Sequence, residues 1–291
     1  MEMSKMTMIG VIGGSGLYDL EDIQDKDWVE VETEYGAPSD SILTGYIGSQ
    51  QIAFIPRHRR GHVFSPTTVP YKANIAALKK LGAKHLLSFS ACGSLNAAMK
   101  PGDFVIVDQY VDRTVTRDKS FFGTGAVGHV SLADPICKSL AELVADVCNN
   151  LGVTSHSRGT YVAIEGPQFS TKAESVLYKD VWRCDVIGMT NVPEMNLARE
   201  AGICYASVAM VTDFDCWNED HGNVTVEEII ATMNQNSANA QNVLVETVKQ
   251  FGSLSQCGTG CQTAAEYALI TKPDSLEQGA VEKLRRAGIC S

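Results

Sequence analysis

The chain has 291 residues, of which 44% are hydrophobic and 20% charged, the composition of a folded globular protein rather than a disordered one. Acidic residues outnumber basic ones by 34 to 24, and the net charge of -10 argues against a general nucleic-acid-binding protein. No apolar stretch has the roughly 18 to 20 residues that a membrane helix needs, and residues 1–8 lack the features of a signal peptide. We therefore expect a cytoplasmic protein without nucleic-acid or membrane partners.

The nine cysteines are an odd number and mostly stand in apolar surroundings, as buried free thiols of a reducing compartment do. The C-terminal segment differs, because Cys257 and Cys261 bracket three residues there and Cys290 lies next to the last residue. A disulfide or redox-active pair in this segment is the alternative to free thiols.

Apolar runs bounded by turn residues alternate with segments of helical period, which predicts an α/β fold. We expect strands at 8–12, 42–47, 52–55, 85–90, 104–107, 160–164, 184–188 and 203–210. We expect helices at 69–81, 135–151, 171–178, 193–200 and 226–251. No linker of Pro, Gly and Ser divides residues 1–251, which we interpret as one catalytic domain. Residues 252–291 form a C-terminal extension of unclear role, rich in Gly, Ser, Thr and Cys up to residue 263 and helical in appearance afterwards.

A glycine-rich turn at 13–17, with the sequence GGSGL, follows the first expected strand. Such turns let backbone amides approach an anion closely. The dinucleotide-binding pattern fails because Asp19 stands where Gly or Ala is required, and the Lys of a phosphate-binding P-loop is absent. A phosphate-binding turn that includes Ser15 and a plain tight connection both remain open.

Five basic or imidazole residues fall within six positions after the strand at 52–55: Arg57, His58, Arg59, Arg60 and His62. In so acidic a chain they concentrate positive potential where a phosphate could bind, and Arg can donate to two phosphate oxygens at once. A solvated basic loop is the alternative. A metal site is less favoured, because the Arg neighbours would repel a cation and no carboxylate lies nearby in sequence.

Two further strand ends carry candidate site residues. Ser90 and Ala91 end the strand at 85–90 in a run of small residues, where hydroxyls and amides can complete an anion pocket. Asp213 and Asp215 follow the strand at 203–210, and an apolar environment would raise the pKa of at least one of them and make it a general acid. A close-packed turn is the alternative for the first pair. A metal-binding pair or a plain loop is the alternative for the second.

Two turns, at 164–170 and 187–194, place polar and aromatic groups between a strand and a helix. Taken in order with the motifs above, they resemble the trimeric purine nucleoside phosphorylase family over about 8–251, and within it the branch that acts on 5′-methylthioadenosine. The resemblance rests on 13–17, on Arg57-His58 with His62, on 91–94, on 165–170, on Met189-Thr190 and on 212–217. It implies a twisted central mixed sheet flanked by helices, assembled as a homotrimer with shared sites.

The resemblance also implies roles for individual residues. Phosphate would be held by Ser15, Arg57, His58, Ser90, the amide of Ala91, and Thr190. Met189 would lie along the ribose and Phe169 against the purine. Asp213, protonated, would donate to purine N7, while Asp215 would receive the 6-amino group. The methylthio group would lie in an apolar cup of Val226, Ile229 and Ile230, with His129 supplied by the neighbouring subunit. For each helix residue, core packing is the alternative.

The implied reaction is phosphorolysis of 5′-methylthioadenosine to adenine and 5-methylthioribose 1-phosphate, a step of purine and methionine salvage. It requires no metal and no organic cofactor, since inorganic phosphate is a co-substrate. Three alternatives stay open. A 6-oxopurine nucleoside phosphorylase would require an amide in place of Asp213 or Asp215. A hydrolytic nucleosidase would not need Arg57 and His58. A nucleoside-binding protein without turnover would not explain an acid beside a phosphate pocket.

Overall fold

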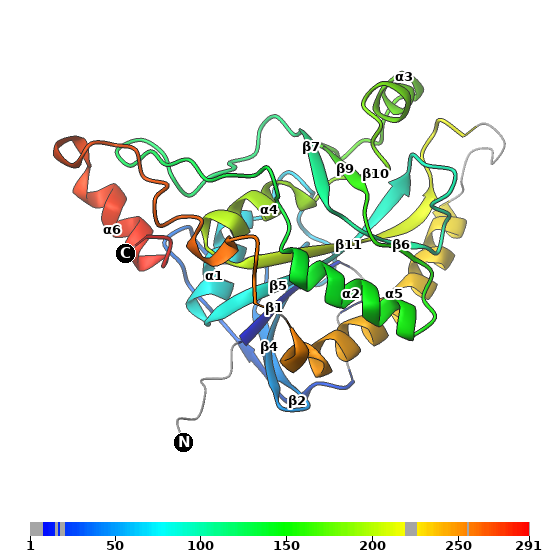
Figure 1. The fold of residues 1–291 in the computed structure, drawn as a ribbon, viewed down its shortest axis with the longest axis horizontal. Helices are drawn as coiled ribbons and strands as arrows, with labels where there is room; N and C mark the ends of the chain where they lie inside the picture. Colours follow the sequence, from blue (N-terminus) through cyan, green and yellow to red (C-terminus); the bar gives the residue numbers. More distant parts are fainter. Residues whose placement is uncertain (1–7, 15–16, 18–20, 219–225, 255, 291) are drawn as a thin grey trace.

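The computed structural model describes residues 8–14, 17, 21–218, 226–254 and 256–290 (Figure 1). Its strands are β1 (Met8–Gly13), β2 (Gln24–Val29), β3 (Ile42–Ile47), β4 (Gln50–Pro56), β5 (Ala83–Ser94), β6 (Phe104–Ile106), β7 (Gln109–Arg113), β8 (Ser155–His156), β9 (Thr160–Ile164), β10 (Val186–Gly188) and β11 (Cys204–Phe214). The α-helices are α1 (Tyr71–Lys80), α2 (Lys138–Asn150), α3 (Lys172–Val176), α4 (Asn191–Glu200), α5 (Val226–Lys249) and α6 (Gln278–Arg286). The expectation of a mixed α/β fold is confirmed.

One large mixed sheet forms the centre of the molecule. Its strands run in the order β2-β3-β4-β1-β5-β10-β9-β7, and β11 pairs with β5 on a branch of this path. β1 is parallel to both β4 and β5, and β11 is parallel to β5, whereas β2, β3 and β4 form an antiparallel meander. All six residues of β1 are buried, as the apolar sequence MIGVIG predicts for a strand covered on both faces.

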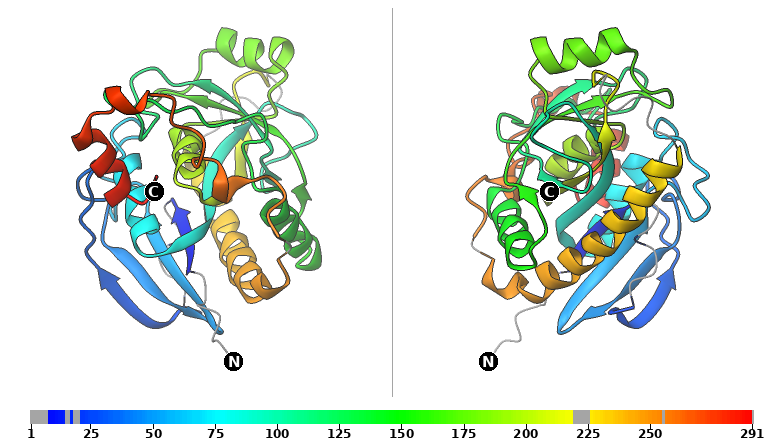
Figure 2. Two further views of the ribbon diagram at one scale, coloured as in Figure 1. Left: turned by 60° about the vertical axis from the view of Figure 1, so that its left-hand side comes forward. Right: turned by 90° about the vertical axis from the view of Figure 1, so that its right-hand side faces the viewer.

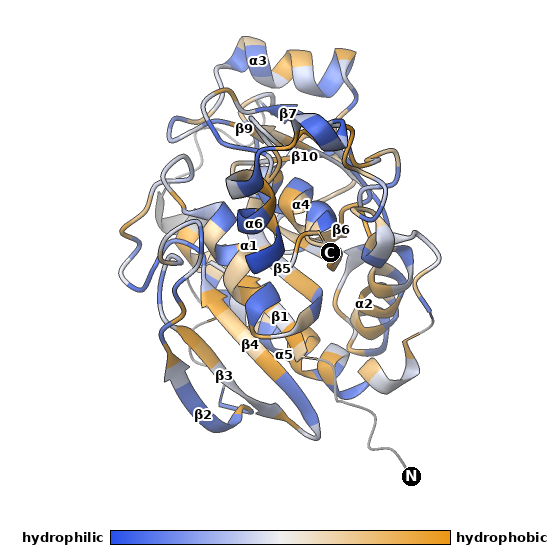
Figure 3. Ribbon diagram, turned by 90° about the vertical axis from the view of Figure 1, so that its left-hand side faces the viewer, coloured by the Kyte–Doolittle hydropathy of each residue, from blue (hydrophilic) through white to orange (hydrophobic). Residues whose placement is uncertain are grey.

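Helices cover both faces of the central strands (Figure 2). α1 and α4 pack against each other on one side, and α2 and α5 pack against each other on the other side. Figure 3 shows the hydropathy of the elements: β3 and β4 are largely apolar, whereas α6 and much of β2 are hydrophilic. Because β1 and β11 are both parallel to β5, these three strands end at the same edge of the sheet. Open α/β sheets bind ligands at this position.

Each expected strand and helix is present, with shifted ends in most cases. β2, β7 and β8 were not expected from the sequence. β2 has the polar sequence QDKDWV and is almost wholly exposed, so it carries no alternation of apolar and polar residues from which a strand could be predicted. It forms a strand because β3 offers unpaired backbone groups at the edge of the sheet, and not because of its own composition.

The C-terminal segment is less helical than expected. Within it, α6 spans nine residues, and short 3-10 turns account for most of the other regular structure. It lies along the loop at 121–130, where the amide of His129 donates to the carbonyl of Ala268 at 2.8 Å and that of Ile270 donates to Val127 at 2.9 Å. In the part of the chain that the structure describes, no helix is long and apolar enough to cross a membrane.

Candidate active site

A cavity of about 370 Å³ opens where β1, β5 and β11 end. Nine of the residues expected in the site line it: Arg57, His58, Ser90, Ala91, Phe169, Met189, Thr190, Asp213 and Asp215. They come from five separate parts of the sequence, and the strand order is what brings them together. Because the lining is a strand edge with a few polar groups in an apolar wall, it has the character of a small-molecule site.

Arg57 is the most buried charged group of the cavity, with 1% of its surface exposed. Its Nε and Nη2 donate to the Glu194 carboxylate at 2.9 and 3.2 Å, and Nη1 donates to the carbonyl of Phe89 at 3.0 Å. Burial lowers the pKa of Arg57, but the charge of Glu194 more than offsets it and the net shift is upward. Nη2 also donates to Oγ of Ser88 at 2.8 Å. The guanidinium is thereby fixed in place and always charged, and of its five N–H groups one, on Nη1, has no partner among the described residues and could donate to an anion.

His58 is neutral at physiological pH. Burial, together with the charge of Arg57, lowers its pKa to about 4. Its Nδ1 lies 2.9 Å from the carbonyl oxygen of Phe64 and must donate there, since a carbonyl only accepts. The neutral ring therefore leaves Nε2 as a hydrogen-bond acceptor. His62, which also lines the cavity, stacks on this ring at a centroid distance of 4.4 Å.

Hydroxyl groups complete this end of the cavity. Ser90 is buried on β5, and its Oγ lies 3.0 Å from Oδ1 of Asn191, to which it donates. Asn191 in turn donates to the hydroxyl of Tyr110 at 3.3 Å. Thr190 is the N-cap of α4 and is buried as well. The Ser90 hydroxyl is thus held by buried side chains. Val192 has non-helical φ and ψ angles, so α4 is kinked directly after Thr190 and Asn191.

Asp213 and Asp215 lie at the far end of the β5–β11 pair. Burial raises the pKa of Asp213 to about 6, assisted by the charge of Asp215 and reduced by the Thr212 hydroxyl, 2.6 Å from Oδ1. Burial also raises the pKa of Asp215, whose Oδ2 has no hydrogen-bond partner among the described residues. Carboxyl groups with raised pKa values in a cavity are candidates for a general acid.

The register of β5 against β11 shows how far Ser90 lies from Asp213 along the strands. Ser90 pairs with Ala209 and Gly93 with Asp213, with a bulge just before Asp213. Three residues of strand separate Ser90 from Gly93, which is about 10 Å. A Cβ at Gly93 would come within 3.2 Å of the Ile187 side chain, which is a tight approach, and would lie at an ordinary contact distance of 3.5 Å from Oδ2 of Asp213. A bulge re-aims side chains next to a site, as it does here.

Arg117 was not expected from the sequence, yet it holds two loops of the cavity together. It is buried and donates to the carbonyls of Met189 and Val192 from one loop and of Glu165 from the other, the last at 2.7 Å. Arg117 also forms an ion pair with the Glu165 carboxylate. Burial would raise the pKa of that carboxylate, but hydrogen bonds from the amides of Val115 and Thr116 lower it to about 2. Arg117 and Glu194 lie far in sequence from their partners Glu165 and Arg57, so no local motif predicted that they would support the cavity.

The outer wall of the cavity is aromatic and apolar. Phe169 is 80% exposed at the mouth, where a planar ligand could stack on it. Met189 lies against Gly166, which has a positive φ of 66°. A Cβ added at this glycine would come within 2.5 Å of the Met189 Sδ, so a side chain there would be strained and would displace Met189. α5 contributes Met233, Asn236 and Ser237.

Some expected site residues lie elsewhere or cannot be placed. Ser15 and the side chains of Val226 and Ile229 lie outside the described residues. Ile230 is 51% exposed and does not line the cavity. The side chain of α5 that lines the cavity is instead Met233, about one helical turn further along. His129 is exposed on the surface of its own chain, away from the cavity. Its contribution to a neighbouring subunit remains a prediction.

Comparison with known proteins agrees with this geometry. The sequence matches the phosphorylase superfamily over residues 8–249. The chain belongs to this family. It is 55% identical over 279 residues to the S-methyl-5'-thioadenosine phosphorylase of Cereibacter sphaeroides, covering 96% of both chains. The family match stops at residue 249, whereas this relative is similar over almost the whole length.

Solved structures of the family have the same fold. A methylthioadenosine phosphorylase from an antarctic soil metagenomic library superposes with a TM-score of 0.91 at 43% identity, covering 97% of this chain and 99% of that one. The methylthioadenosine phosphorylase of Schistosoma mansoni, solved in complex with adenine, gives a TM-score of 0.83 at 34% identity, covering 89% of this chain and 96% of that one. The twisted mixed sheet expected from the sequence is therefore that of the family.

Proposed function

We propose that the chain catalyses phosphorolysis of 5′-methylthioadenosine to adenine and 5-methylthioribose 1-phosphate, as a pentosyltransferase. One observation carries the proposal: the fixed Arg57 and the neutral His58 line the same cavity as Asp213, a carboxyl group whose pKa is about 6. Relatives of this family at 46–55% identity over almost the whole chain bear the name of this activity. The substrate is a small nucleoside, and neither the acidic charge nor the cavity favours nucleic acid.

The anion-binding end would hold phosphate beneath the anomeric carbon. Arg57 donates to a phosphate oxygen, and the hydroxyls of Ser90 and Thr190, the amide of Ala91 and, from outside the described residues, Ser15 complete the set. Phosphate at neutral pH can attack through an oxygen that carries no proton. His58 would accept a hydrogen bond from the P–OH group, since Nε2 of its neutral ring is an acceptor.

The carboxyl end would protonate the leaving base. As the C1′–N9 bond breaks, Asp213 donates its proton to N7 of the purine, and the electron pair of the broken bond stays on adenine. The sugar gains cationic character, which the adjacent phosphate stabilises before the new C–O bond forms. Over the whole reaction, the proton lost from the P–OH group balances the proton gained by adenine. Asp215, with an acceptor oxygen that has no described partner, would receive the 6-amino group.

The rest of the substrate would lie between these ends, with the ribose along Met189 and the purine against Phe169. The methylthio group would meet the apolar wall of α5 at Met233. Val226 and Ile229, whose side chains lie outside the described part of the structure, remain proposed members of this wall. We further propose a cytoplasmic homotrimer in which His129 completes the neighbour's site, and a reaction that needs no metal or organic cofactor. The exposed position of His129 supports the shared site.

The test is release of free base from 5′-methylthioadenosine, adenosine and methylthioinosine, each with and without inorganic phosphate. We expect phosphate-dependent release, fastest from 5′-methylthioadenosine. Release without phosphate would indicate a hydrolytic nucleosidase. Preference for methylthioinosine would overturn the assignment of the two carboxylates to a 6-aminopurine, and no release would favour a binding protein.

A further inference from the structure

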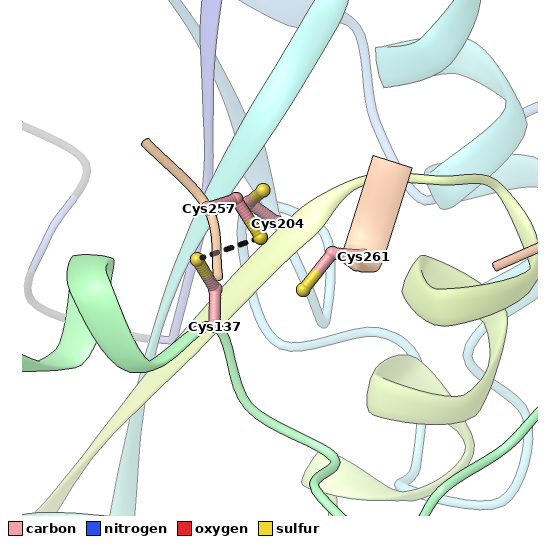
Figure 4. Close-up of side chains that lie close together, drawn as sticks. All are labelled: Cys137, Cys204, Cys257 and Cys261. Carbon is pink, nitrogen blue, oxygen red and sulfur yellow. Dashed lines mark hydrogen bonds between the residues drawn. The ribbon is translucent and has the colours of Figure 1, made fainter. Parts of the chain in front are cut away.

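Four cysteines converge on one point beneath the C-terminal segment, and none of them lines the cavity. Figure 4 shows the side chains of Cys137, Cys204, Cys257 and Cys261 facing one another. All four sulfur atoms lie within 4.8 Å of one another, and Sγ of Cys137 and Sγ of Cys257 are 3.8 Å apart. None of the four is in a disulfide, whose sulfurs would be about 2.05 Å apart.

These distances fit a tetrahedral metal centre. Zinc binds thiolates at about 2.3 Å, which places the sulfurs of a tetrahedral site about 3.8 Å apart. The Cys137–Cys257 separation already has that value, and no separation among the four sulfurs exceeds it by more than about 1 Å. Four sulfur ligands in a tetrahedron are typical of zinc, and no carboxylate or imidazole is part of the cluster.

The ligands come from elements that are fixed before any metal binds. Cys137 is the N-cap of α2, and its amide donates to the carbonyl of Tyr205 at 2.8 Å, next to Cys204 at the start of β11. Cys257 and Cys261 lie on the two sides of a tight turn closed by Gly260 in the left-handed conformation, with φ of 68°. Three of the four cysteines are buried, and the fourth is half-buried. The cluster therefore needs no large rearrangement to close on an ion.

The surroundings carry the second layer of contacts that structural metal sites have. The amide of Lys138 donates a hydrogen bond, at 3.2 Å, to the hydroxyl of Thr259 in the turn between Cys257 and Cys261. Buried Arg199 donates to the carbonyl of Thr259 at 3.4 Å. A zinc ion with four thiolates has a net charge of -2, and the guanidinium of Arg199 lies where it partly compensates that charge.

We propose that Cys137, Cys204, Cys257 and Cys261 form a structural zinc site that anchors the C-terminal segment to the catalytic fold. Binding of one Zn²⁺ would release the four thiol protons to solvent, without any change of oxidation state. The anchored segment runs on to the loop at 121–130 and contacts it through Ala268 and Ile270. The site would therefore also hold the loop that carries His129. It does not depend on the proposed reaction.

The test is metal content. Protein purified under reducing conditions without chelators should contain about one zinc per chain by elemental mass spectrometry. Cys257→Ser with Cys261→Ser should lose it, whereas Cys290→Ser, a cysteine of the same segment outside the cluster, should retain it. A mercurial reagent should release the zinc into a colorimetric indicator as the thiols react.

A second measurement covers a variant that fails to fold. Wild-type protein in which cobalt replaces zinc should show the visible absorption bands of a tetrahedral thiolate site. The proposal is overturned if reduced wild-type protein, both as purified and after incubation with Zn²⁺, holds no more zinc than the double variant. It is also overturned if alkylation and intact mass show two of the four cysteines joined as a disulfide in protein purified without oxygen.

Discussion

The two ends of the cavity solve opposite electrostatic problems. At the phosphate end a permanent cation, Arg57, is buried beside an anion, Glu194, so the charge is compensated and its geometry is fixed. At the purine end the buried groups are two carboxyl groups, Asp213 and Asp215, and burial raises their pKa values without an offsetting cation. A buried charge is thus retained where a paired counter-charge is supplied, whereas burial without one raises the pKa of a carboxyl group and makes its protonated form easier to reach.

This difference corresponds to function. Binding an anionic co-substrate requires a cation that stays charged at every physiological pH. Protonating a leaving base requires a group that holds a proton near neutrality and gives it up readily. Single substitutions at either end should therefore have effects of different kinds, which the following measurements separate.

The largest effect is expected from Asp213→Asn, which keeps the shape but removes the proton that Asp213 would donate. We expect kcat to fall by about 10²- to 10⁴-fold, the contribution of a positioned general acid. The measurement is the steady-state rate of adenine release, with the folded state checked by thermal unfolding. Near-normal turnover in a folded variant would remove Asp213 from the acid role.

At the phosphate end, Glu194→Gln should affect stability. The substitution leaves Arg57 charged, buried and without its ion-pair partner, at a cost of about 3–5 kcal/mol. Denaturant unfolding gives the free energy directly. Glu282→Gln on exposed α6 is the matched control and should change it by no more than about 0.5 kcal/mol. Equal stability of the two variants would contradict the charge compensation described here.

The pH dependence should reveal the carboxyl end. The pKa of Asp213 is about 6, and the acid must be protonated to act. kcat/KM should therefore fall as pH rises above about 6, by up to about tenfold per pH unit. The pKa of His58 is about 4, so His58 stays neutral over this range and causes no further change of kcat/KM with pH. The Asp213→Asn variant should lack this fall of kcat/KM above pH 6. The ionisation of phosphate itself affects the variant and the wild type alike. An unchanged profile in the variant would assign the fall to another group.

Arg57→Lys keeps the charge but loses the two-pronged geometry that pairs with Glu194 and the anion. We expect the KM for phosphate to rise about tenfold, in line with loss of one charge-assisted hydrogen bond, while the KM for the nucleoside changes much less. Initial rates over a grid of both concentrations separate the two. Parallel changes in both constants would mean that Arg57 supports the whole cavity and not the phosphate end.

The smallest effect is expected from Phe169→Ala at the mouth of the cavity. An exposed aromatic ring that stacks on a base contributes about 0.5–1.5 kcal/mol, so the KM for the nucleoside should rise a few-fold with the phosphate KM unchanged. Phe169→Tyr is the control and should be close to wild type. A variant indistinguishable from wild type would place the purine away from this ring.

The sequence predicted the parts of the fold and site that have local signals. Apolar strands such as β1 and β11 were found by their composition, and the motifs at Arg57, Ser90 and Asp213 fall at strand ends, where the parallel order gathers them. The exposed edge strand β2 has no apolar pattern and could not be found in this way.

The groups that the sequence did not indicate act over long separations. Glu194 is 137 residues from Arg57, and Arg117 reaches Met189 across 72 residues. A buried ion pair of this kind depends on which strands and helices become neighbours, and single residues carry no periodicity. The cysteines show the same limit, since Cys257 and Cys261 were noticed in sequence, but their partners Cys137 and Cys204 emerge only from the fold.

The central claim is that phosphate, and not water, takes the sugar from the base. The most direct measurement is phosphorus NMR of a reaction containing 5′-methylthioadenosine and inorganic phosphate, with adenine followed in parallel. We expect one equivalent of a sugar 1-phosphate ester for each adenine released. Adenine accompanied by free methylthioribose, with the phosphate signal unchanged, would contradict it.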